Sequence, residues 1–346
     1  MTRCSSVFLI GILSGFLAAC GSSQEGTRKP QGEPRPKIGL LMDTLKEGER
    51  WTRDRDLFLE RAKELRADVL VESAEGDAAK QQQLAESLLE RGVQALVVVP
   101  HNAEAAGAIV TAAKKKNVGV ISYDRLILKA DIDLYVSYDN RMVGQQEAQF
   151  LRNRAPKGNY ILIGGSPTDH NAKLIREGQQ GALEDAIKRG DIKVVAEPWA
   201  TDWRADVAMT LTEEALKKAK NQVVAVVASN DVTAGGVVQA LEKNGLAGKV
   251  LVSGQDANLD ALRRIVAGTQ AMTVYKPLRP LAREAAQSAV QMAKGEKVEG
   301  TSTVDNGMKE VQAVLWNPVI IHKDTIPILI NDRFYTKEQV YGAGGK

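Results

Sequence analysis

Cysteine is nearly absent from this chain, which has two cysteines among 346 residues. Cys4 and Cys20 both lie close to the N-terminus, ahead of every segment with the pattern of a folded body. No disulfide and no cysteine-based metal centre are therefore expected within that body. The body has to be stabilised by a hydrophobic core, which a chain of this length can bury.

Aromatic residues, histidines and an excess of one charge are also scarce. Aromatic residues make up 5% of the chain, there are 3 histidines, and the net charge is +3 with both signs interspersed. So weak and mixed a charge argues against nucleic-acid binding. His101, His170 and His322 lack metal-ligand spacing, and phosphate loops, dinucleotide fingerprints, calcium loops and nucleophile elbows are missing. We expect no cofactor, no metal and no enzymatic activity.

The N-terminus has the pattern of an export signal. A short positive start is followed by an apolar stretch over residues 7–19, which is too short to span a bilayer, and small residues precede Cys20. This pattern resembles a bacterial lipobox and predicts a signal peptide over residues 1–19 and acylation of Cys20. Residues 20–36 are rich in Gly, Ser, Gln and Pro and read as a flexible tether. We expect a lipid-anchored protein of the cell envelope; an ordinary secretory signal is the alternative.

Short apolar runs that end on polar residues recur along the rest of the chain. Each run is of strand length and most are followed by a helical pattern, which is typical of βα units in a parallel sheet. The ten predicted strands are residues 37–42, 68–72, 95–100, 118–123, 134–137, 160–164, 193–197, 223–228, 250–254 and 271–275. Ligands of such sheets bind outside the carboxyl ends of the strands, so the polar residues there are the candidate site.

The strand count exceeds that of an eight-fold barrel, which is the alternative α/β architecture. We therefore predict two doubly wound parallel-sheet lobes, the first formed by residues 37–138 and 277–303 and the second by residues 139–276 and 304–340. The stretch over residues 301–314 lacks a helical period and is expected to form a third connection between the lobes.

Several short segments resemble one known family. They are residues 37–40, 97–100 and 229–236, and, more specifically, residues 49–56, 123–125, 164–173, 253–256 and 267–277. They resemble the periplasmic sugar-binding proteins of ABC importers, and among these the branch that binds D-xylose. The resemblance implies a two-lobed clamp with three crossovers that closes on one monosaccharide, D-xylose being favoured. It also implies a monomer that delivers the sugar to a membrane permease with a separate ATPase subunit.

Two tryptophans are the best candidates for stacking on a sugar ring. A pyranose has an apolar face, so a flat aromatic side chain suits it. Trp51 begins a charged helix and Trp203 follows a strand; without the resemblance, each would more simply be a core anchor. The resemblance assigns both to the sugar and leaves Trp199 and Trp316 as structural residues.

Polar residues at strand ends complete the candidate site. Asp124 and Arg125 follow one strand, and the resemblance assigns both to the sugar, the alternative being a surface ion pair between them. Asp256 matches the carboxylate that accepts from two neighbouring hydroxyls. Asn230 is a candidate ligand or helix cap, and Lys276 is a candidate ligand or hinge residue.

A further group of candidates rests on the resemblance alone. It assigns Asp169, Asn171 and Arg176 to the sugar, and it matches Arg50 to a polar contact, although a solvated helix face would also explain Arg50. His170 departs from the family pattern. If it faced the ligand, it would alter sugar preference and its pH dependence.

Two other functions fit parts of the sequence. A glycoside hydrolase would use paired carboxylates such as Asp124 and Asp256, but Arg125 and Lys276 nearby would keep them ionised and leave no general acid. A sensory receptor for chemotaxis or two-component signalling would use the same clamp as an importer. The sequence alone does not separate these two roles.

Overall fold

The computed structural model describes residues 34–45 and 49–342. The expected signal peptide (1–19), the expected acylation site Cys20 and most of the expected tether (20–36) lie outside these residues. The contacts of the chain divide it before Arg35, and the elements below belong to the unit that begins there.

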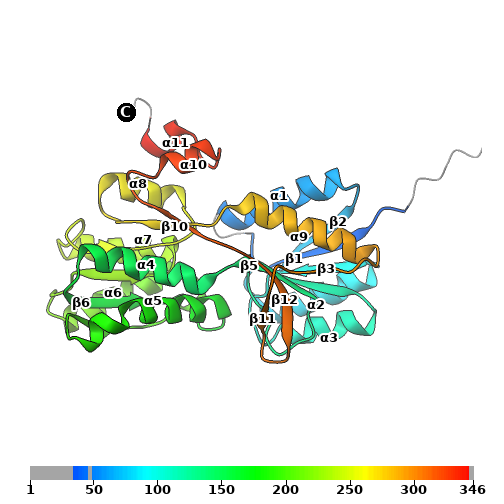
Figure 1. The fold of residues 1–346 in the computed structure, drawn as a ribbon, viewed down its shortest axis with the longest axis horizontal. Helices are drawn as coiled ribbons and strands as arrows, with labels where there is room; N and C mark the ends of the chain where they lie inside the picture. Colours follow the sequence, from blue (N-terminus) through cyan, green and yellow to red (C-terminus); the bar gives the residue numbers. More distant parts are fainter. Residues whose placement is uncertain (1–33, 46–48, 343–346) are drawn as a thin grey trace, which may run out of the picture. The chain divides into compact units, whose positions relative to one another are not determined.

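The first lobe contains a mostly parallel sheet with the strand order β11-β12-β5-β4-β3-β1-β2 (Figure 1). Only β11 runs antiparallel to its neighbour. The strands are β1 (Lys37–Met42), β2 (Asp68–Ser73), β3 (Ala95–Val98), β4 (Gly119–Tyr123), β5 (Leu134–Tyr138), β11 (Ser302–Asp305) and β12 (Glu310–Trp316). Helices α1 (Glu49–Glu64) and α9 (Leu278–Ala293) cover one face, and α2 (Ala78–Glu90) and α3 (Gly107–Lys115) cover the other.

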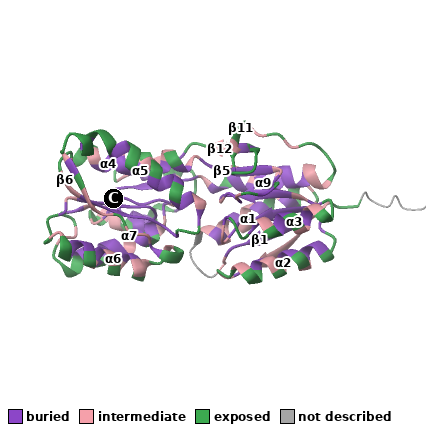
Figure 2. Cartoon of the chain, turned by 90° about the horizontal axis from the view of Figure 1, so that it is seen from below, coloured by how far each residue is buried: buried purple, intermediate pink, exposed green. Residues whose placement is uncertain are grey.

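Alternating side chains of the strands explain why both faces need helices. In β1, Leu40 packs in the core beneath α1 and α9, whereas the next residue, Leu41, packs in the core beneath α2 and α3. Such near-continuous apolar strands are typical of sheets buried on both sides. Figure 2 shows this arrangement as buried strands between helices whose outer faces are exposed.

The second lobe repeats the pattern with the strand order β7-β6-β8-β9, all parallel. These strands are β6 (Gly158–Ile163), β7 (Ile192–Ala196), β8 (Ala225–Ala228) and β9 (Leu251–Val252), and β10 (Thr273–Tyr275) pairs antiparallel with β13 (Val319–Ile321). The helices are α4 (Asn140–Arg154), α5 (His170–Lys188), α6 (Ala205–Lys218), α7 (Asp231–Lys243), α8 (Leu259–Ala267), α10 (Pro327–Asn331) and α11 (Lys337–Tyr341), with the short helix η1 (Thr201–Trp203). The doubly wound prediction is confirmed, because in both lobes the chain reverses its strand order after the second strand.

The chain passes between the lobes three times: after β5, after β10 and after β12. The sequence-based boundary at residue 304 is too early. The reason is β12, which pairs in parallel with β5 and so belongs to the first sheet, while β13 joins β10 of the second lobe. The alternation of apolar and polar residues in β12 was not recognised as a strand pattern.

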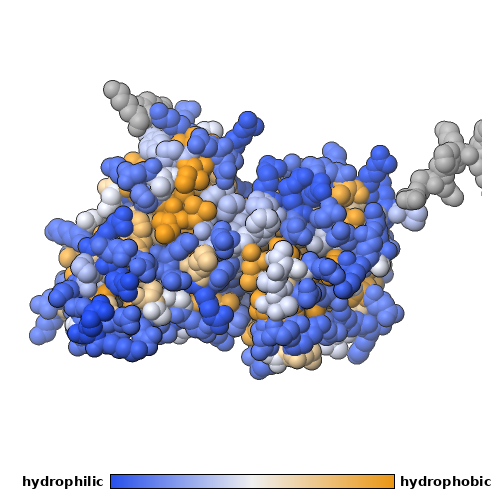
Figure 3. All heavy atoms as spheres, in the orientation of Figure 1, coloured by the Kyte–Doolittle hydropathy of each residue, from blue (hydrophilic) through white to orange (hydrophobic). Residues whose placement is uncertain are grey.

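The surface is mainly hydrophilic in the face shown in Figure 3, with apolar side chains in separate groups. The exposed large hydrophobic residues of the described chain are Ile187, Val232, Met308, Trp316 and Ile328. Over residues 34–45 and 49–342, none of the helices combines the length and the apolar character needed to cross a bilayer.

Candidate functional site

A cavity of about 830 Å³ lies where the carboxyl ends of the strands of both lobes meet. All of the predicted ligand residues except Arg176 line it: Arg50, Trp51, Asp124, Arg125, Asp169, Asn171, Trp203, Asn230, Asp256 and Lys276. Residues that are distant in sequence therefore meet in one cavity, as expected from the position of ligands outside the carboxyl ends of parallel strands. Most of these side chains are buried, so their charges need partners within the site.

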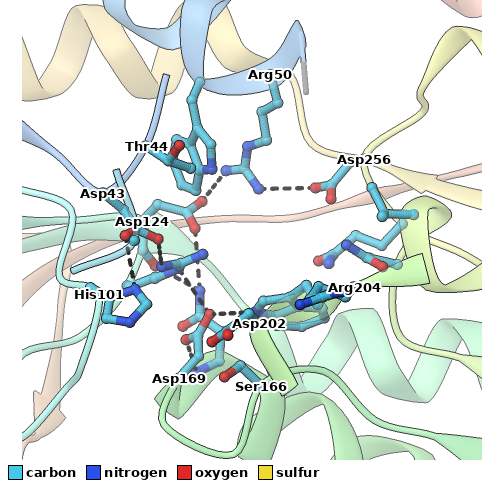
Figure 4. A pocket seen from close by; sticks show the side chains of 18 of the residues that line it. Asp43, Thr44, Arg50, His101, Asp124, Ser166, Asp169, Asp202, Arg204 and Asp256 are labelled. Atoms are coloured by element: carbon cyan, nitrogen blue, oxygen red, sulfur yellow. Dashed lines mark hydrogen bonds and ion pairs between the residues drawn. The ribbon is translucent and has the colours of Figure 1, made fainter. Parts of the chain in front are cut away.

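Arg50 is the centre of one charged group (Figure 4). Its guanidinium forms ion pairs with Asp124 of the first lobe and with Asp256 of the second, and the Arg50 Nη1 to Asp256 Oδ1 distance is 2.9 Å. The Lys276 Nζ lies 3.5 Å from Asp256 and 3.8 Å from Asp124. Burial acts to raise the pKa of Asp124, but Arg50, Lys276 and Arg125 hold it below its usual range. This carboxylate is therefore an acceptor at neutral pH.

Arg125 is the centre of a second charged group. It follows β4, forms a 2.5 Å ion pair with Asp43 at the end of β1, and forms a 2.8 Å ion pair with Asp169 of the second lobe. Burial raises the pKa of Asp169, and Arg125 opposes this shift. The sequence-based alternative, an ion pair between Asp124 and Arg125, is not what the structure shows, since each pairs with other residues.

Asp169 and Asn171 hold the beginning of α5 against the first lobe. The Asp169 side chain caps the helix by accepting from the Asn171 backbone N–H at 2.9 Å. The Asn171 amide donates to the backbone carbonyl of Asp124 at 3.0 Å and to its carboxylate at 3.3 Å. These contacts tie residues of the two lobes together at the floor of the cavity.

The two predicted stacking residues come from different lobes. Trp51 begins α1, and Trp203 ends η1 and donates its indole N–H to Asp169 at 3.2 Å. Trp203 packs so closely on Gly165 that a Cβ at that position would lie 2.2 Å from the ring. Glycine is required there because no side chain fits between the backbone and the indole. Two flat apolar surfaces thus line the same cavity as the charged groups.

Asn230 lies at the end of β8 and serves as the cap of α7. Its side-chain oxygen accepts from the Thr233 backbone N–H at 2.8 Å, and Thr233 completes a capping box. The next residue, Asp231, does not cap this helix. Asp231 is buried instead, accepts from Gln270, Thr273 and the backbone of Asn258, and burial raises its pKa to about 7. Asn230 still lines the cavity, as predicted for a ligand.

Arg176 does not line the cavity, in contrast to its predicted place. Its guanidinium donates to the backbone carbonyls of Glu197, Leu162 and Pro198 at 2.9 to 3.2 Å and lies 4.4 Å from the centre of the Trp199 ring. Burial lowers the pKa of Arg176 to about 10. The Arg176 side chain therefore holds the backbone near the ends of β6 and β7 together, outside the cavity. His170 is likewise outside the cavity lining, and burial lowers its pKa.

Sequence reasoning missed several residues that line the cavity, above all Asp43 and His101. Their side chains pair at 2.9 Å between His101 Nδ1 and Asp43 Oδ1, and this hydrogen bond is the main reason why the pKa of His101 is raised. Asp43 directly follows β1 and His101 follows β3. The expectation that polar residues at the carboxyl ends of strands form the site, which predicted Asp124, applies equally to Asp43 and His101. Ser166, Asp202, Arg204 and Gln255 also line the cavity and were not predicted.

The arrangement suits a small polar ligand with an apolar face. Carboxylates, guanidinium groups and amides supply acceptors and donors from both lobes, and two indoles supply flat surface. Over the described residues, no group of three or more His, Cys, Asp or Glu side chains is placed to hold a metal ion.

Comparison with known proteins places the chain among solute-binding proteins. Residues 38–297 match the periplasmic binding protein domain family. The chain is 48% identical to the D-xylose-binding periplasmic protein of Haemophilus influenzae over 88% of its own length and 92% of the relative. It is 44% identical to the D-xylose-binding periplasmic protein of Escherichia coli, with the same coverage of both chains.

A solved structure agrees with these sequence relatives. The carbohydrate transporter solute-binding protein from Chloroflexus aurantiacus, in complex with D-glucose, superposes with a TM-score of 0.82 at 29% identity, covering 87% of this chain and 97% of that one. The two sequence relatives are binding proteins, and the solved structure is the solute-binding protein of a carbohydrate transporter. This supports the expectation of a binding protein without enzymatic activity and disfavours the glycoside hydrolase alternative.

Proposed function

The chain belongs to the periplasmic binding protein family, and from that premise we propose that it binds one monosaccharide, D-xylose, for an ABC importer. The observation that carries the proposal is the meeting, in one cavity, of Trp51 and Trp203 with the charged groups around Arg50 and Arg125. D-xylose-binding relatives at 48% and 44% identity support the choice of sugar.

Each lining residue has a role that its chemistry suits. The sugar ring lies between Trp51 and Trp203, whose faces contact its C–H groups. Asp124, Asp256 and Asp169 accept from hydroxyls, Arg50, Arg125 and Lys276 donate to hydroxyl oxygens, and Asn171 and Asn230 do either. Arg176 is left out of the proposed contacts because its guanidinium is held by three backbone carbonyls behind the cavity.

Binding brings the two lobes together around the sugar. One of the three connections between the lobes lies beside the cavity, since Lys276 follows β10 at the second crossing and lines the site. Such connections act as hinges in two-lobed binding proteins. The closed monomer then delivers its sugar to a permease whose ATPase is a separate chain.

We also propose that the protein is exported and attached to the cell envelope through a lipid on Cys20. The support is the apolar stretch that ends at that cysteine and the periplasmic location named for the relatives. Cells expressing the full chain are expected to show the protein in the membrane fraction, and the Cys20→Ala variant is expected in the soluble fraction. Equal partition of the two proteins would refute the anchor.

Calorimetric titration of the purified protein with D-xylose tests the sugar assignment. Ribose, arabinose, glucose and galactose serve as competitors, and tryptophan fluorescence follows the same titration because Trp51 and Trp203 line the cavity. Saturable binding of xylose at micromolar concentration, lost in Trp203→Ala, supports the proposal. A matched control is Trp199→Phe, since Trp199 does not line the cavity. Binding of another sugar in preference to xylose would show that the protein is a sugar-binding protein of different specificity. If none of these sugars binds, the proposal of a monosaccharide-binding protein is refuted.

A further inference from the structure

Asp54 is a buried carboxylate next to the cavity that takes no part in lining it. It lies on α1, one helical turn after Arg50, and its exposed fraction is 1%. A carboxylate so deeply buried is costly to keep charged unless strong partners hold it. Its partners therefore indicate what it does.

Both carboxylate oxygens of Asp54 are engaged. Oδ2 lies 3.4 Å from the Nε of Arg50, and Oδ1 accepts a hydrogen bond from the hydroxyl of Tyr123, the last residue of β4. The carboxylate thus joins α1 to β4, the strand that ends just before Asp124. It contacts Arg50 through Nε, whereas the two carboxylates of the cavity contact the terminal nitrogens.

A guanidinium group is planar and rigid, so fixing its Nε sets the direction of its two terminal nitrogens. In Arg50 these nitrogens face Asp124 and Asp256, the acceptors proposed for the sugar. We propose that Asp54 is a positioning residue, which aims Arg50 at the ligand through this contact with Nε and weakens sugar binding when it loses its charge. The inference rests on the proposed function for the identity of the ligand.

The charges around Asp54 allow this carboxylate to change state within a physiological range. Burial raises the pKa of Asp54 to about 6, against the attraction of Arg50 and Lys276 and the hydrogen bond from Tyr123, while Asp124 adds to the increase. Tyr138 of β5 is the other titratable group that interacts with it. Above pH 6 the charged carboxylate holds Arg50, and below pH 6 the protonated acid loses this attraction. Sugar affinity is therefore expected to fall as the pH drops.

The test compares xylose affinity between pH 5 and pH 8 in the full-length protein and its variants. For the unmodified protein we expect affinity to fall as the pH drops through 6; a tenfold fall would correspond to a pKa of Asp54 that is about one unit lower with sugar bound than without it. Asp54→Asn should bind weakly at every pH and show no such transition. Asp56→Asn is the matched control, because Asp56 is on the same helix with an exposed side chain. A transition that persists in Asp54→Asn would overturn the proposal.

Tyr123→Phe is the second variant, and it serves even if Asp54→Asn fails to fold. Removing the hydroxyl that donates to Asp54 takes away a contact that lowers the pKa of Asp54, so the transition should move to higher pH. An unmoved transition would overturn the proposal.

A measurement without sugar separates this inference from the proposed function. The guanidinium carbon of Arg50 lies 4.7 Å from the centre of the Trp51 ring, so tryptophan fluorescence reports its position. A fluorescence transition near pH 6 that Asp54→Asn abolishes supports the positioning role even if the ligand is not xylose. Its absence in the unmodified protein counts against the positioning role even if xylose binds.

Discussion

Arg50 of the first lobe and Asp256 of the second are joined across the cavity by a 2.9 Å ion pair. The two residues of this ion pair are 206 positions apart in the sequence. Because each belongs to a different lobe, this pair couples the geometry of the ligand site to the distance between the lobes. Lys276, on the connection between the lobes, approaches the same carboxylate at 3.5 Å.

Removing the charge of Asp256 should weaken xylose binding strongly. Asp256→Asn replaces one acceptor oxygen by an amide donor, which faces Arg50 and Lys276. Hydrogen bonds to charged groups contribute about 1.5–3 kcal/mol, so we expect a loss of affinity of about 10- to 100-fold, measured by calorimetry. Asp260→Asn is the matched control, since its side chain is 81% exposed in the same lobe. Equal affinities in the two variants would remove Asp256 from the site.

A methyl group at residue 165 should displace an indole from the cavity. In Gly165→Ala the new Cβ would lie 2.2 Å from the Trp203 ring, so the ring has to move. We expect a loss of xylose affinity of at least about tenfold, with little change in the ellipticity of the helices. Gly181→Ala is the control, because a Cβ there meets nothing within 4 Å. Wild-type affinity in Gly165→Ala would show that the position of Trp203 is unimportant for binding.

The buried Glu147 of α4 should make the protein less stable as the pH rises. Burial raises the pKa of Glu147 well above its usual value, against the hydrogen bond from Gln179. The folded state therefore binds a proton that the unfolded state releases above about pH 4.5, so the free energy of unfolding falls by about 1.4 kcal/mol per pH unit from this group alone.

Glu147→Gln keeps the shape of the neutral acid and abolishes its titration. We expect the advantage of this variant over the unmodified protein to grow between pH 5 and pH 8 in urea denaturation. Glu177→Gln, a substitution of an exposed residue on α5, is the control. Parallel pH profiles of Glu147→Gln and the unmodified protein would show that Glu147 is ionised in the folded state.

His101 should contribute to stability with the same sign of pH dependence. The hydrogen bond with Asp43 raises the pKa of His101 above its usual value of about 6.5. Its contribution is fully present below pH 6.5 and is lost as the pH rises through the raised value. Thermal unfolding of His101→Gln should thus show a clear destabilisation at pH 5.5 that shrinks at pH 9. A constant difference across this range would exclude a charged His101–Asp43 pair.

The sequence predicted those parts of the molecule that depend on local patterns. The short apolar runs predicted the positions of strands β1 to β10. The position of polar residues at the carboxyl ends of these strands predicted that Asp124, Asn230 and Asp256 lie in one site. The family resemblance added Arg50 and Trp203, which no periodicity singles out. Both kinds of prediction concern which segment a residue belongs to.

The errors concern contacts that local patterns do not contain. Arg176 donates to three backbone carbonyls outside the cavity, which depends on how α5 packs on β6 and on the segment after β7. The alternation in β12 could have marked it as a strand, but its place beside β5, far back in the sequence, is not a local pattern. His101 was considered only as a metal ligand, although its place after β3 satisfied the rule that found Asp124.

The position of β12 between β11 and β5 also fixes the order in which the two lobes can be completed. The first sheet closes only when Trp316 is available, after all the strands β6 to β10 of the second lobe have been synthesised. The second lobe in turn waits for β13, a few residues later. Neither lobe is complete as a nascent domain until its late strand has been synthesised, so the two lobes finish folding together.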